Sequence, residues 1–150
     1  MNYEEAYEDL LKRLLATMAT VETDESVLQF SAQAADSIRA AAKEVPEFYV
    51  GEFLQMLRSA VVERVQAETA AGTQALQDAK MDAATASAEL TARYAAESAA
   101  GDRAAQHAIW GNREKLQAAN QAKVDAVSAR MDVLALQLKA FSALQSALGI

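Results

Sequence analysis

Apolar side chains recur at alternating intervals of three and four residues through the last part of the sequence, from about Gln117 to Leu148. This spacing is a heptad pattern, which keeps one stripe of a helix turned toward a partner helix along its length. A helix cannot cover such a stripe by itself, so the pattern predicts packing against another helix of the same chain or of a neighbouring subunit. We call this stripe the heptad face, and its members are Val124, Val127, Met131, Leu134, Leu138 and Phe141.

Polar residues also fall on this pattern. Gln117 and Asn120 lie on its extension toward the N-terminus, and Gln145 interrupts it near the end. A polar residue in a heptad seam can set the register or the number of associated helices at some cost in stability. It can equally mark a solvent-exposed, fraying part of a helix, and the sequence leaves both interpretations open.

The rest of the chain also favours helix. Proline occurs once and glycine five times in 150 residues, and the abundant alanine, leucine, glutamate and glutamine are strong helix formers. No segment shows the alternation of apolar and polar residues, bounded by turns, that is typical of strands. The predicted fold class is all-α.

Residues 1–66 are predicted to form a helical head of three helices. Asn2 can cap the first helix, which should end near Thr20. The second helix should begin at a turn with a cap, Thr23-Asp24-Glu25-Ser26, and end near Glu44. The Val45-Pro46 pair separates it from the third helix, because proline disfavours helical geometry in the residue before it. The third helix contains the densest group of large apolar residues, so we expect the core of the head to form around it.

Residues 67–150 are predicted to form long alanine-rich helices, arranged as a helical hairpin or a coiled-coil stalk. Gly72 and Gly101 bracket one expected helix of about 73–99, and Asp102 can cap a last helix that reaches Leu148. An alanine-lined stripe lets helices approach closely but buries little apolar area per residue. The best stripe of the first long helix consists of Leu76, Ala79, Ala83, Ala86, Leu90 and Tyr94.

Charge and composition exclude several classes of function. The net charge of −7 argues against nucleic acid as a partner, because phosphate binding needs a basic face. The absence of cysteine excludes disulfides and thiolate metal sites. No apolar stretch approaches the roughly 20 residues that span a bilayer, and the acidic start lacks the pattern of a secretory signal. We therefore expect a cytoplasmic protein, or one packaged there into something larger.

His107 and Trp110, each the only residue of its type, lie three positions apart and so share one helix face. A lone histidine lacks the partners that catalysis or metal binding requires, so we interpret Trp110 as an aromatic interface anchor. The residue three before His107 is Ala104, so the Glu-x-x-His pattern of helical di-metal sites is absent. We expect no enzyme activity and no catalytic, cofactor-binding or metal-binding residue.

The segment Ala108-Ile109-Trp110 is followed by Arg113-Glu114 and by alanine-rich helix. Over about residues 104–132 this combination resembles helical structural proteins of tailed-bacteriophage virions. The resemblance implies a tail, neck or internal component of a virion, with no active site to carry over.

Two hypotheses for function follow. The first is a structural or assembly protein of a multi-subunit complex, specifically a bacteriophage virion, that associates with copies of itself or with other structural subunits through the heptad face and Trp110. The second is a soluble cytosolic adaptor, chaperone or inhibitor that binds one protein partner through a helical groove. The number of subunits in the complex would distinguish them.

Overall fold

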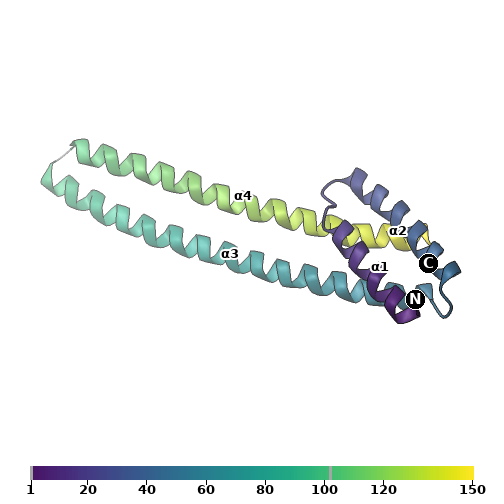
Figure 1. Cartoon of the computed structure of the whole chain (residues 1–150). Helices are drawn as coiled ribbons and strands as arrows, with labels where there is room; N and C mark the ends of the chain where they lie inside the picture. Colours follow the sequence, from purple (N-terminus) through teal and green to yellow (C-terminus); the bar gives the residue numbers. More distant parts are fainter. Residues whose placement is uncertain (1, 102) are drawn as a thin grey trace. The chain divides into compact units, whose positions relative to one another are not determined.

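The computed structural model describes residues 2–101 and 103–150 of the chain (Figure 1). This described part contains no strand, so the predicted all-α class is confirmed. The helices are α1 (Tyr3–Met18), α2 (Asp24–Glu44), α3 (Val50–Ala100) and α4 (Arg103–Ala147).

The chain divides into two compact units. One consists of Met1–Thr69 together with Met131–Ile150, and the other of Ala70–Arg130. We call the first unit the head and the second the hairpin. The predicted boundary at 66 lies close to Thr69, but residues 131–150, expected to be part of the stalk, belong to the head. Periodicity identified the apolar face of this segment without identifying which helices cover it.

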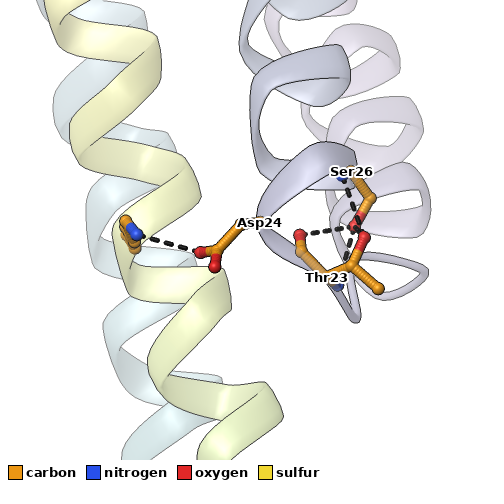
Figure 2. A network of polar contacts seen from close by, with 4 residues as sticks. Thr23, Asp24 and Ser26 are labelled. Carbon is orange, nitrogen blue, oxygen red and sulfur yellow. Dashed lines mark hydrogen bonds and ion pairs between the residues drawn. The ribbon is translucent and has the colours of Figure 1, made fainter.

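The first two helices begin at caps that the sequence predicts. The Asn2 side chain accepts a hydrogen bond from the Glu5 amide at 2.8 Å, which satisfies one of the free donors at the start of α1. Thr23 and Ser26 form a reciprocal capping box at the start of α2 (Figure 2). The α2 helix ends at Glu44, where Val45 takes the extended conformation expected before proline.

The α3 helix is continuous where a break was expected between 66 and 73. Glycine inside a helix costs only about 1 kcal/mol relative to alanine, so Gly72 alone does not interrupt a long run of good helix formers. The helix ends at Ala100 and is followed by Gly101, whose φ of 75° is the left-handed conformation typical of the residue after a helix C-terminus. The predicted cap at Asp102 lies outside the described residues.

The core of the head combines all four helices. In Figure 1 α1 and α2 lie beside the first part of α3 and the last part of α4. Tyr7, Phe48 and Phe53 form an aromatic group with ring centroids 4.8–6.0 Å apart, a spacing at which aromatic pairs attract each other. The same buried cluster contains aliphatic side chains, including Leu10, Met18, Ile38, Leu57, Leu134 and Leu144.

Tyr7 also places a polar group at the edge of this core. Its hydroxyl donates to Glu52 Oε2 at 3.1 Å and accepts from the Tyr49 amide at 3.0 Å. Burial is the main cause that raises the pKa of the Tyr7 phenol, the Glu52 carboxylate raises it further, and the hydrogen bond with Tyr49 opposes them. The folded head therefore favours the neutral phenol.

Truncation of a core leucine should show how much the head depends on this packing. Leu57 is fully buried, so Leu57→Ala should lower the free energy of unfolding by about 2–5 kcal/mol. Leu28 is 68% exposed, and Leu28→Ala should change it by less than about 0.5 kcal/mol. Urea denaturation followed by circular dichroism measures both. Equal effects of the two substitutions would contradict the described core.

The raised pKa of Tyr7 predicts a loss of stability in alkali. Below about pH 10, the ordinary pKa of tyrosine, the phenol is neutral in both the folded and the unfolded chain, and its contribution is complete. At higher pH the unfolded chain releases this proton first, so stability falls until the folded pKa is passed. Tyr7→Phe should be less stable at neutral pH and lose less stability above pH 10. Parallel stability curves for the two proteins, measured by denaturation at each pH, would contradict this assignment.

Candidate functional site

The seven residues predicted to form an interface have different environments in the folded chain. Leu134 and Phe141 are buried in the head, with 2% and 7% of their surface exposed. Half-buried side chains belong to Val124, Val127 and Met131. The remaining two are exposed, Leu138 to 39% and Trp110 to 52%.

Gln137, rather than its neighbour Leu138, faces the core of the head. Gln137 is fully buried, as are Ala140 and Leu144, which the heptad pattern does not include. Successive helix residues are about 100° apart, so Gln137 and Leu138 cannot both point to the centre of one core. We call Leu134, Gln137, Ala140, Phe141 and Leu144 the head face of α4. The spacing from Leu134 through Gln137, Phe141 and Leu144 is also three-four-three, and this was the signal available in the sequence.

Gln137 is bound by an arginine from α3. The Arg64 guanidinium donates through Nη2 to Gln137 Oε1 and through Nη1 to the backbone oxygen of Leu15, the latter at 3.3 Å. These bonds join α1, α3 and α4 inside the head. Two buried donors have no hydrogen-bond partner among the described residues, Arg64 Nε and Gln137 Nε2. A buried polar group left in this way costs about 1–3 kcal/mol.

Polar contacts at the surface also hold the last part of α4. Lys139 Nζ lies 2.9 Å from Asp24 Oδ1, beside the capping box of α2 (Figure 2). The Arg39 guanidinium donates to the backbone oxygen of Ala147. Both contacts are solvent-exposed, and exposed ion pairs contribute about 1 kcal/mol or less.

In the hairpin, α3 and α4 lie side by side and run in opposite directions (Figure 1). Leu90 and Tyr94 line a hollow with Ile109 and Arg113, and further along Ala83 and Ser87 line another with Leu116 and Asn120. The predicted pairing of the two alanine-rich segments is therefore present within one chain.

The seam of this hairpin is only partly covered. Among its described apolar residues, Ala79 and Ile109 alone are buried, with 8% and 6% of their surface exposed. The other large aliphatic residues of the seam are half-buried: Leu76, Leu90, Leu116, Val124 and Val127. Two paired helices shield one side of each seam and leave the other side to water.

Tyr94 and Trp110 form an exposed aromatic pair near the turn of the hairpin. Their ring centroids are 6.3 Å apart, and the Arg113 guanidinium carbon lies 5.2 Å from the centroid of the Trp110 ring, within the range of a cation–π contact. Tyr94 and Trp110 also border an open hollow of about 490 Å³ that Arg103 and His107 help to line. We call Tyr94, Trp110 and Arg113 the aromatic cluster.

Residues that could hold a metal are not grouped together. In residues 2–101 and 103–150, no three His, Asp or Glu side chains lie close enough to share an ion. Within the same residues, none of the helices is both long and apolar enough to cross a membrane.

The buried polar pair of the head leads to a prediction about coupling. Arg64→Met leaves the buried Gln137 amide without its partner, and Gln137→Met removes one of the two acceptors of the Arg64 guanidinium. Each should lower the free energy of unfolding by about 1–3 kcal/mol. The double variant removes both polar groups and should recover most of this loss, because an apolar pair of similar volume can replace a buried polar pair. Chemical denaturation of the three variants and the wild type completes the cycle. Additive losses would mean that Arg64 and Gln137 do not interact energetically.

Comparison with known proteins finds no matching family model, no matching curated protein and no matching solved structure. The function must therefore be inferred from the residues of this chain and from their packing.

Proposed function

We propose that this chain is a non-enzymatic structural or assembly protein of a multi-subunit complex, and more specifically of a bacteriophage virion. It acts by helix–helix association with copies of itself or with other structural subunits. The observation that carries the proposal is the half-buried seam of the hairpin, which retains apolar surface that one chain does not cover.

The energetic reason is the composition of the seam. Alanine hides little area, so the pairing of α3 and α4 gains less hydrophobic stabilisation per residue than a leucine-lined seam would. A further helix laid along the pair would bury the exposed sides of Leu76, Leu116 and Val124. Bundles of three or four helices stabilise long helices in this way, because their tertiary packing rather than helix propensity supplies most of the stability.

The aromatic cluster supports the same proposal. Tryptophan, tyrosine and arginine are the residues that most often dominate the binding energy of protein interfaces. Trp110 and Tyr94 expose large apolar rings that remain in water in the single chain. A partner helix that covered them would bury aromatic area at a small cost in side-chain entropy.

The assignment to a virion rests on the resemblance over residues 104–132, which include Trp110 and Arg113 of the aromatic cluster. A tail, neck or internal component would meet the need for several helices side by side, because such components are repeated or closely packed. The net charge of −7 favours protein partners over nucleic acid.

An alternative is a cytoplasmic adaptor, chaperone or inhibitor that binds one protein partner. The open hollow beside Trp110 and His107 favours this alternative, because it could receive a single side chain or a short helix of the partner. This protein would remain a monomer until the partner was added.

Light scattering over a concentration series tests the proposal on the purified chain. We expect masses that rise from 16.1 kDa to a defined multiple of it, with a shift of the Trp110 emission to shorter wavelength as the ring leaves water. Trp110→Ala should weaken association by about tenfold or more. Tyr49→Ala is the matched control, since Tyr49 is an exposed aromatic residue in the head. A monomer at every concentration would contradict self-association.

A further inference from the structure

We infer that the aromatic cluster and the open hollow beside it form a docking site for an acidic segment of a partner subunit. This segment presents a carboxylate next to an apolar side chain. The site lies wholly within the hairpin, where Tyr94 and Trp110 border both neighbouring hollows. This inference rests on the proposed function and states the chemistry of the surface that the partner presents.

The apolar part of the site consists of two aromatic rings that the single chain leaves in water. Tyr94 is 40% exposed and Trp110 is 52% exposed, with their ring centroids 6.3 Å apart. Beside them a small hollow of about 80 Å³ is lined by Leu90 and Ile109. An apolar side chain of the partner that covered the rings would remove aromatic surface from water, which is the dominant favourable term in most protein association.

The charged side chains of the site are cations. Arg103 and His107 line the larger hollow and Arg113 lines the smaller one. Glu97 and Glu114, the described carboxylates nearest to them in the sequence, line neither hollow. Neither arginine has a carboxylate of the described residues within ion-pair distance. Their guanidinium groups are therefore available to a carboxylate of the partner, which arginine binds through two parallel hydrogen bonds.

The charge around the site differs in sign from that of the rest of the chain. Residues 90–116 contain four of the 14 basic residues and three of the 21 acidic ones, so this stretch is slightly basic in an acidic chain. At physiological ionic strength, charges are screened beyond about 8 Å. A docked segment therefore responds to the local cations more than to the net charge of −7, and complementary charge orients an acidic partner on the site.

Single-stranded nucleic acid is the competing ligand, because it also binds to aromatic rings and arginine. Its affinity depends on a groove of several cations that follows the phosphates of the backbone. The described residues of the two hollows provide only two arginines and one histidine, and acidic residues outnumber basic ones over the rest of the chain. A carboxylate-bearing peptide, which needs one or two cations, fits these residues better.

The fluorescence of Trp110, the only tryptophan, tests the inference on the full chain. The probe is a hexapeptide of alternating glutamate and leucine with blocked ends, and the matched probe has glutamine in place of glutamate. We expect the acidic peptide to change the Trp110 emission with a midpoint concentration about tenfold or more below that of the glutamine peptide. Added salt should raise the midpoint of the acidic peptide alone, because it screens charged contacts.

Substitution of both arginines tests their role. Arg103→Gln combined with Arg113→Gln should raise the midpoint of the acidic peptide about tenfold or more and leave that of the glutamine peptide nearly unchanged. Arg93→Gln is the matched control, since Arg93 is an exposed arginine of the hairpin that lines neither hollow. Calorimetric titration repeats the measurement without the optical probe, because Arg113 lies over the Trp110 ring and its loss changes the emission. Circular dichroism checks that each variant is folded.

The outcomes separate this inference from the proposed function. Equal binding of the two peptides, or equal effects of the double variant and Arg93→Gln, would overturn the inference. Tighter binding of an oligothymidylate than of the acidic peptide would overturn it in favour of nucleic acid. If neither peptide binds while the wild type associates with itself through Trp110, the inference is wrong and the proposed function stands. If the acidic peptide binds as expected to a chain that stays monomeric, the inference stands and self-association is wrong.

Discussion

The return of α4 to the head is the interaction on which the rest of the structure depends. Residues 131–147 supply Leu134, Ala140, Phe141 and Leu144 to a core whose other buried members come from residues 1–69. Without this segment, the buried sides of α1, α2 and the start of α3 would face water. The hydrogen bond between the half-buried Arg64 of α3 and the buried Gln137 of α4 ties these two helices together, and they must meet in one register to form it.

The two units differ in how they use apolar surface. The head buries large aromatic and aliphatic side chains from four helices, whereas the hairpin aligns two helices along alanine and leaves its larger residues half-covered. Burial of a leucine or phenylalanine stabilises a fold by about 1.5–3 kcal/mol, and alanine offers only a small part of that area. One unit therefore has a core of large side chains, and the other leaves apolar surface of its larger residues in contact with water.

Local signals in the sequence predicted much of this fold, while tertiary features escaped them. The caps at Asn2 and Thr23 and the stop at Val45-Pro46 depend on neighbouring residues, so they could be read directly. The helix break predicted near Gly72 was wrong, because the free-energy cost of one glycine in a helix is small and strong helix formers lie on both sides of it. The heptad pattern located an apolar face on α4, but the burial of Gln137 instead of Leu138 depends on how many helices surround the segment, and no local signal gives that number. The exposure of Trp110 likewise depends on which side chains of α3 pack against its ring, and the local sequence does not show this.

The distance along the chain between contacting residues has a consequence for the order of folding. Arg64 and Gln137 are 73 residues apart, and Asp24 and Lys139 are 115 apart, with the whole hairpin synthesised in between. The α1–α2 pair can form from local contacts soon after it leaves the ribosome, but the head core has to wait until α4 has been made. Once α4 has been made, turn formation at Gly101 favours closure of the head, because it brings the end of α4 back alongside α3 and reduces the loop entropy of closing the head. During synthesis the unfinished head exposes its apolar surface for the time that the ribosome needs to make the hairpin.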